Sequence, residues 1–270
     1  MNTSDNHPIN LPVKGKLTLI YALSLVIAIL MTIASVVGIR YRTLIYPIDE
    51  LVRTFVSNDV VNLFIGLPIL LGSMALTRRG KLIGLLCWTG ALFFVFYNYT
   101  AYVFAMPLNW AFPLHLALMT LSAYTLIGLV AGMDGKAVQQ RLSSAVPEKF
   151  AGGVLAGLGI LFFLRVISVM VSALTGGDFP TEAEFAVNIA DFLTTPTWII
   201  GGLLLWRRKV FGYVTGLGLL FQGSMLFIAL IVFLLLQPVL TSTPFALADV
   251  LVIFVMGMIC FIPLRSLFAG

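Results

Sequence analysis

Long apolar runs alternate with short polar connections along the whole chain. The runs are about 20 residues long, which is enough for a helix to cross the hydrocarbon core, and they lack the period of two expected of membrane β-strands. We place the spans near residues 17–38, 59–77, 82–105, 110–132, 151–174, 186–206, 210–236 and 245–266. Because lipid offers no partner for backbone polar groups, helices are the structure that such runs adopt. The pattern therefore predicts an all-α, multi-pass membrane protein of about eight transmembrane helices.

Composition agrees with a lipid environment. Hydrophobic residues make up 60% of the chain and charged residues 10%, whereas soluble domains have about 45–50% apolar and about 25% charged residues. Residues 1–16 form a polar tail. The apolar run that follows is longer than the core of a signal peptide, so we expect an uncleaved first span.

The net charge of +5 indicates orientation rather than a nucleic-acid partner. Most of the 16 basic residues lie in the short connections between spans, on one side of the membrane if the N-terminus is cytoplasmic. The positive-inside rule then predicts a protein of the plasma or inner membrane with both termini cytoplasmic. Most of the acidic connection residues, Asp59 among them, are expected on the outer side.

The chain resembles itself at a shift of 128 or 129 residues. The shift places Pro68 on Pro196, Gly84 on Gly212, Gly90 on Gly218, and the pair Arg78 and Arg79 on Arg207 and Arg208. We therefore predict a tandem repeat of four-helix units, residues 17–131 and 150–270, joined by a cytoplasmic linker at 132–149. Four spans per unit would give both units the same orientation. The alternative is that similar connection signals arose independently.

Small residues at four-residue spacing let neighbouring helices approach closely. Such pairs occur at Gly153 with Gly157 and at Gly212 with Gly216. They predict either packing within the fold or a face for a membrane partner or a second copy of the chain.

Ionisable residues within spans mark a site or face the interior of the bundle, because they are costly in lipid. Three occur in the outer half: Arg165, Asp191 and Asp249. Arg165 and Asp191 lie at similar depth, so we predict that they pair. The uncharged polar residues at similar depth are Asn62, Tyr97, Asn98, Tyr99, Tyr102 and His115.

These residues together predict a polar vestibule, open to the outer side, sealed below by apolar packing and suited to a small anionic ligand. Two alternatives stay open at this stage. The tyrosines are also typical of an aromatic belt at the membrane interface, and Asp249 would also fit the cap of its helix.

Motifs of enzymes and of cofactor proteins are absent from the sequence. His7 and His115 are the two histidines, and the two cysteines, Cys87 and Cys260, form neither a CxxC motif nor a disulfide framework. The sequence also has no nucleophile elbow, phosphate-binding loop or clustered metal ligands. We expect no cofactor, no metal and no catalytic residue.

A small-molecule transporter is the function that a repeat with polar groups at its interface favours. Pro196 is expected to unwind the sixth span beside Asp191. The first alternative is a non-catalytic membrane subunit or ligand-binding sensor. The second is a lipid-modifying enzyme that uses Asp191, Asp249 or His115 as acid or base.

Overall fold

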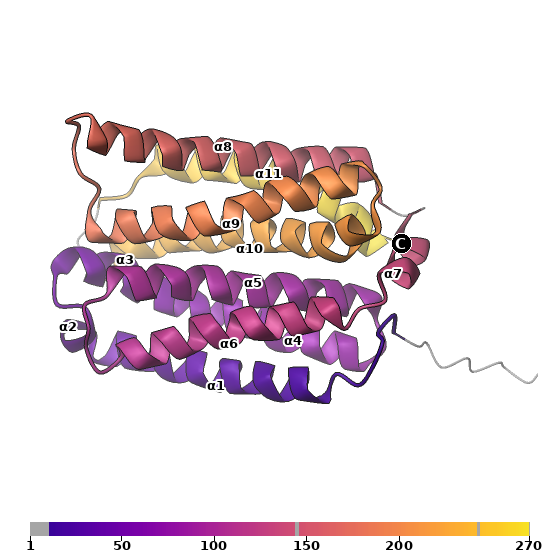
Figure 1. The fold of residues 1–270 in the computed structure, drawn as a ribbon. Helices are drawn as coiled ribbons and strands as arrows, with labels where there is room; N and C mark the ends of the chain where they lie inside the picture. Colours follow the sequence, from indigo (N-terminus) through magenta and orange to yellow (C-terminus); the bar gives the residue numbers. More distant parts are fainter. Residues whose placement is uncertain (1–10, 144–145, 242–243, 270) are drawn as a thin grey trace, which may run out of the picture.

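A computed structural model describes residues 11–143, 146–241 and 244–269 of the chain (Figure 1). Within these ranges all the regular elements are helices. They are α1 (Thr18–Arg40), α2 (Arg42–Ile45), α3 (Asp49–Val61), the π-helical segment η1 (Asn62–Gly66), α4 (Leu67–Arg78), α5 (Leu82–Ala105), α6 (Phe112–Ala131), α7 (Gly135–Leu142), α8 (Glu148–Leu174), α9 (Glu182–Trp206), α10 (Val210–Leu240) and α11 (Leu247–Ala269). In the described part, eight helices are long and apolar enough to cross a membrane, which confirms the predicted all-α membrane fold.

The second span differs most from its predicted bounds. It begins at Asp49 and continues through η1 to Arg78, about three turns earlier than the predicted start near residue 59. Charged residues such as Arg53 lower the hydropathy of α3, but Leu51 and Phe55 turn a buried apolar face to the bundle. Asp59 therefore lies within a span, and its assignment to an outer connection was wrong.

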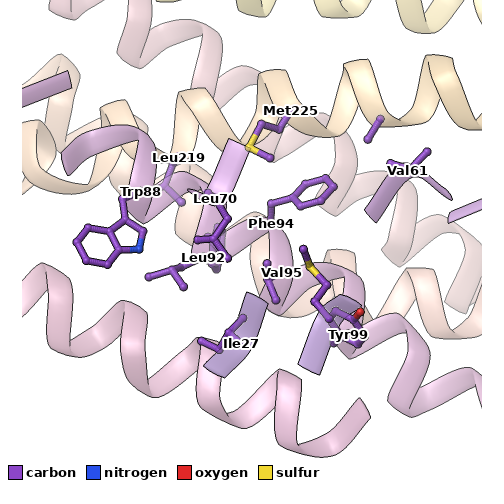
Figure 2. Packing of buried hydrophobic residues seen from close by; sticks show 14 of the residues in the cluster. Ile27, Val61, Leu70, Trp88, Leu92, Phe94, Val95, Tyr99, Leu219 and Met225 are labelled. Atoms are coloured by element: carbon purple, nitrogen blue, oxygen red, sulfur yellow. The ribbon is translucent and has the colours of Figure 1, made fainter. Parts of the chain in front are cut away.

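The helices form two groups that meet at α5. Figure 1 shows α1 to α6 in one part of the bundle and α8 to α11 in the other. α5 is the most buried span and contacts α4 and α6 from its own group and α9 and α10 from the other. A helix that is apolar all round belongs in such a central position. Figure 2 shows Trp88 and Phe94 of α5 in this core, near Leu70 of α4 and Met225 of α10.

The α4–α5 and α9–α10 connections have the same hydrogen bonds at a shift of 128 residues. The N–H of Lys81 donates to the carbonyl of Leu76 at 3.1 Å, and the N–H of Lys209 donates to the carbonyl of Leu204 at 2.9 Å. Each bond closes a helix C-terminus in the manner of a Schellman motif.

The residue before each lysine is left-handed, as this motif requires. Gly80 has φ 77° in the first connection, and Arg208 has φ 55° in the second. The following helix then packs on the preceding one through a glycine: a Cβ on Gly84 or on Gly212 would press on the backbone of the helix before it.

The central helices α5 and α10 cross where Gly90 meets Gly218. A Cβ on Gly90 would overlap the carbonyl oxygen of Gly218, and a Cβ on Gly218 would overlap the hydroxyl of Thr89. Contact between equivalent positions is what a two-fold relation between two units would give. Duplication of the four-helix unit stays a prediction.

The predicted linker contains a helix of two turns. Asp134 caps α7 by accepting from the N–H groups of Lys136 and Ala137 at 3.1 and 3.3 Å, and Val138 and Leu142 are buried. Close to α7, the N–H of Asp134 donates to the carbonyl of Pro12 at 2.8 Å. The linker and the described end of the tail thus pack on the bundle.

The small-residue pairs differ in what they contact. Gly212 and Gly216 lie in the packing of α10 against α9, which is the first of the two alternatives, packing within the fold. Gly153 approaches the ring of Trp206, and Gly157 has open space where a Cβ would lie. An open face therefore remains on α8 alone among these four positions.

Candidate functional site

A cavity lies between the two helix groups, toward the end of the bundle where α3 begins and α5 ends. This end holds connections 41–48 and 106–111 and is the one predicted to face outside. The cavity volume is about 370 Å³, and its walls come from α3, α5, α8, α9, α10 and α11. We call it the interhalf cavity. Its polar lining consists of Thr54, Asn58, Tyr97, Asn98, Arg165, Asp191, Thr194 and Thr195.

Arg165 and Asp191 form the charged part of this lining. Arg165 Nη1 lies 3.2 Å from Asp191 Oδ2, so the pair predicted from their depth is present. Tyr97 OH donates to the other carboxylate oxygen, Oδ1, at 2.9 Å. The Arg165 side chain is 51% exposed, whereas that of Asp191 is 10% exposed. Both carboxylate oxygens therefore have a partner, and the half-exposed guanidinium keeps further N–H donors.

α9 presents Asp191 to the cavity without a break in the helix. A capping box at Thr181 and Glu184 begins α9, and the helix continues through Pro196 to Trp206. The expected unwinding at Pro196 was therefore wrong. Close to the proline, the Thr195 hydroxyl donates to the Asp191 carbonyl at 2.7 Å. Hydroxyl groups of this kind satisfy backbone carbonyls around a proline in a membrane helix.

The end of the cavity nearer the middle of the bundle is apolar. Phe162, Trp198 and Phe227 line it, with the rings of Phe162 and Trp198 in edge-to-face contact at 6.1 Å. Trp198 Nε1 donates to the buried Gln222 Oε1 at 2.7 Å, which fixes the indole ring. The cavity thus combines a charged wall with an aromatic wall.

A second polar group lies inside the first helix group and surrounds Asp59. Tyr46 OH donates to Asp59 Oδ2 at 2.5 Å, and Tyr102 OH donates to Oδ1 at 2.8 Å. Burial, and next the Asp59 carboxylate, raise the pKa of the Tyr46 phenol well above its usual range, so Tyr46 stays a donor. Asp59 itself is 1% exposed. We call the following residues the Asp59 cluster: Ser35, Tyr46, Asp59, Asn62, Tyr99, Tyr102 and His115.

The polar residues singled out in the sequence divide between these two places. Asn98 lines the interhalf cavity, where its side-chain oxygen accepts from Asn58 Nδ2 at 3.2 Å. Tyr99 and Tyr102 are fully buried, so the aromatic-belt interpretation is wrong for both. The ring of His115 lies 5.0 Å from that of Tyr102. Asn62 Nδ2 lies 3.5 Å from Tyr102 OH, so both belong to the Asp59 cluster.

Asp249 is not part of either group. It is exposed in the first turn of α11 and does not line the interhalf cavity. Its exposure is compatible with the helix-end alternative drawn from the sequence.

Sequence reasoning missed Asp59, although a signal was present. Asp59 follows the buried Phe55 by four residues and precedes Asn62 by three, so all three share one helical face. A test of α3 for a buried stripe would have placed the carboxyl inside. Hydropathy averaged over a window of residues does not show this buried face, because the charged residues of α3 lower the average.

Comparisons of the chain with protein-family models, with curated proteins and with solved structures found no match. Among the described residues, no group of three or more His, Cys, Asp and Glu side chains is arranged to hold a metal ion. Functional inference therefore rests on the chemistry of the cavity and of the cluster.

Proposed function

We propose that this integral membrane protein is a transporter for a small amphipathic anion that binds in the interhalf cavity. The observation that carries the proposal is the place of the Arg165–Asp191 pair, which lines a cavity between two four-helix groups. Many transporters bind their substrate between two helical units and expose it by moving one unit against the other.

The lining defines the class of ligand. Arg165 offers free guanidinium donors, which suit a carboxylate, sulfonate or phosphate group. Phe162, Trp198 and Phe227 offer aromatic surface to an apolar body. A cavity of about 370 Å³ lies at the small end of the usual range of about 300–1,000 Å³ for ligand sites. The expected substrate is therefore a compact organic anion.

The pair also explains how the site stays stable without its ligand. Asp191 neutralises Arg165 when the cavity holds water, and Tyr97 holds the carboxylate in place. An arriving anion competes for the guanidinium, so binding would loosen the link between α8 and α9. Both helices belong to the second group, but Tyr97 of α5 in the first group donates to the same carboxylate. A shift of Asp191 would therefore reach the boundary between the groups, which supports a mechanism in which ligand binding and group movement are coupled.

The test is uptake of a permanently charged aromatic anion, p-toluenesulfonate, into proteoliposomes that contain the purified chain. We expect saturable uptake that falls at least about tenfold in Arg165→Gln, since a direct charge-assisted contact is worth about 1.5–3 kcal/mol. Arg53→Gln is the matched control, because Arg53 is exposed on α3 near the same end of the bundle.

Uptake that is equal in the wild type and Arg165→Gln would contradict the proposal. Saturable binding to purified protein without uptake would instead favour the membrane subunit or sensor. Chemical conversion of an added lipid that is lost in Asp191→Asn would favour the enzyme.

A further inference from the structure

We propose that the Asp59 cluster is a binding site for a small monovalent cation, hydronium or sodium, separate from the interhalf cavity. The site lies within the first helix group, where α1, α3, η1, α5 and α6 meet. The inference stands on the geometry of the cluster. Use of the cation to drive transport is an additional step that rests on the proposed function.

The charge of Asp59 is the first observation. Three carboxyl groups in the described part of the chain are buried within spans: Asp59, Glu148 and Asp191. Asp191 pairs with Arg165 at 3.2 Å and Glu148 with Arg208 at 3.6 Å. No Lys or Arg among the described residues lies within 4.0 Å of the Asp59 carboxyl. An ionised carboxylate at this depth is costly unless a positive charge accompanies it.

Unsatisfied polar atoms around Asp59 are the second observation. Eight buried side-chain polar atoms in the described ranges have no hydrogen-bond partner, and four of them belong to the Asp59 cluster. The four are Ser35 Oγ, Asn62 Oδ1, Tyr99 OH and His115 Nδ1. The Asn62 oxygen is solely an acceptor, so it requires a donor or a cation. Buried polar atoms in native proteins nearly always have a partner, and their concentration here indicates a ligand.

The side chains of Asn62, Tyr99 and His115 gather around Tyr102, which donates to the carboxyl. Tyr99 stacks on Tyr102 with ring centroids 5.2 Å apart, and Tyr102 OH holds Asp59 Oδ1. Ser35 lies one helical turn before Gly38, whose Cα faces the carboxyl so closely that a Cβ there would overlap Asp59 Oδ2 and Tyr46 OH. The Ser35 hydroxyl is fully buried on the same side of α1 and has no hydrogen-bond partner. Gly38 therefore allows α1 to close one side of the site.

The backbone beside Asp59 contains a π-helical segment, a feature that is common at binding sites. The π-helical segment η1 begins at Asn62, three residues after Asp59. π-Helical turns inside α-helices occur frequently at functional sites, where they turn a side chain out of the regular helical register. In this chain the turn places Asn62 beside Tyr102.

The donor set selects the kind of cation. One carboxylate balances one positive charge, and the available partners are the oxygens of Asn62, Ser35 and Tyr99 with a single imidazole, His115. The groups that face Asp59 are Tyr46 from the α2–α3 connection, Tyr99 and Tyr102 from α5 and Ser35 from α1, and the ring of His115 from α6 packs on those of Tyr99 and Tyr102. Oxygen donors suit hard cations, and a second carboxylate for a divalent ion is lacking in the described cluster.

The cluster adjoins the interhalf cavity through two neighbouring positions. Asn58 and Asn98 form a hydrogen bond with each other in the cavity wall. Asn58 is the residue before Asp59 on α3, and Asn98 lies one helical turn before Tyr102 on α5. A cation that tightens α3 against α5 would therefore change the cavity wall. This would couple ion binding to substrate binding.

The experiment measures thermal unfolding of the purified full chain in detergent, without any transport substrate. Sodium chloride replaces choline chloride at constant ionic strength, and a parallel series varies pH in choline chloride. Wild type is expected to gain about 5 °C in Tm at saturating sodium, or on acidification if hydronium is the ligand. Asp59→Asn should lose this gain, and Asp178→Asn, an exposed connection carboxyl, should keep it.

An infrared difference spectrum separates the two cations. A band from a protonated carboxylic acid that is absent in Asp59→Asn shows that hydronium gives its proton to Asp59 and leaves water, whereas sodium dependence without this band identifies sodium. Wild-type Tm that responds to neither ion, or a response retained in full by Asp59→Asn, overturns the inference.

A second variant keeps the test decisive if Asp59→Asn does not fold. Tyr99→Phe removes one unpartnered hydroxyl and leaves both hydrogen bonds to Asp59 in place. It should weaken the apparent ion affinity about tenfold while the Tm without the ion stays equal or rises. Unchanged ion affinity in Tyr99→Phe would exclude its hydroxyl and with it the cluster as the site. Because no substrate is present, failure here is distinct from failure of uptake.

Discussion

The two helix groups share the backbone geometry of one connection but differ in the partners of their buried aspartates. The α4–α5 and α9–α10 connections close with the same hydrogen bonds and the same glycine contacts at a shift of 128 residues. The buried aspartates are treated differently: Asp59 is enclosed by tyrosine hydroxyls, whereas Asp191 pairs with Arg165 at a cavity. Close packing therefore constrains the backbone of the α4–α5 and α9–α10 hairpins, whereas the buried polar side chains differ between the two groups.

The difference between the aspartates is a difference in how charge is compensated. Arg165 supplies a permanent positive charge to Asp191, and both residues line the cavity. Asp59 has dipoles from hydroxyl groups and no such charge among the described residues. The Arg165–Asp191 pair suits an anionic ligand that competes with Asp191 for the guanidinium. The Asp59 cluster suits a cation that balances the charge of the carboxylate.

The largest expected effect tests the glycine contacts that the two helix groups share. Gly84→Ala and Gly212→Ala each place a Cβ against the backbone of the preceding helix, so each should lower the free energy of unfolding by about 3 kcal/mol. Denaturation of the purified variants in mixed micelles measures the loss. Gly72→Ala is the control, because nothing lies within 4 Å of its Cβ position on α4. A large loss in one of the two variants with none in the other would break the equivalence.

The next effect separates the two aspartates. Tyr102→Phe and Tyr97→Phe each remove one hydroxyl that donates to a carboxylate, at 2.8 and 2.9 Å. We expect a loss of about 2 kcal/mol for Tyr102→Phe and about 1 kcal/mol for Tyr97→Phe, since Asp191 keeps its arginine. The same denaturation series measures both. Equal losses would mean that Arg165 gives Asp191 no advantage.

The sequence predicted what depends on composition and depth. Eight spans followed from run length, and the Arg165–Asp191 pair followed from two opposite charges at one level of the membrane. The division of the polar residues into two places was missed, because depth does not determine rotation about the helix axis. Asn98 and Tyr99 are neighbours on α5, yet one lines the cavity and the other lies in the Asp59 cluster. Successive helical residues point about 100° apart, and partners from other helices decide which direction is buried.

The ends of a membrane span were hardest to predict where the helix carries charged residues. α3 forms because Leu51 and Phe55 bury one face, whereas hydropathy averaged over the same residues is low. The glycine contacts could be predicted as close packing, but their partners could not: Gly212 and Gly216 meet α9 rather than a second chain.

A smaller effect compares the left-handed residues of the two connections. Gly80→Ala should cost about 1 kcal/mol, because L-residues with a side chain disfavour φ near 77°. Arg208→Gly relieves the same penalty at φ 55°, but it also removes the cation that pairs with the Glu148 carboxylate, whose side chain is only 6% exposed. Because a buried carboxylate without its partner is costly, we expect a net loss of about 1 kcal/mol in the free energy of unfolding. Thermal unfolding of the two variants measures both changes, and a gain in stability for Arg208→Gly would show that the backbone penalty outweighs the ion pair.

The smallest effect concerns Asp249, which the sequence grouped with Asp191 and the structure separates from it. Asp249 is exposed in the first turn of α11 and is not among the residues that line the cavity, so Asp249→Asn should change the free energy of unfolding by less than about 0.5 kcal/mol. Binding of p-toluenesulfonate and the sodium or pH response of Tm should match those of the wild type. Asp191→Asn, in contrast, should alter anion binding, because it frees Arg165 from its internal partner. If Asp249→Asn changed anion binding as much as Asp191→Asn, the ligand would reach the first turn of α11, beyond Ile253 in the cavity wall. The interhalf cavity as defined by its lining would then be too small to be the whole site.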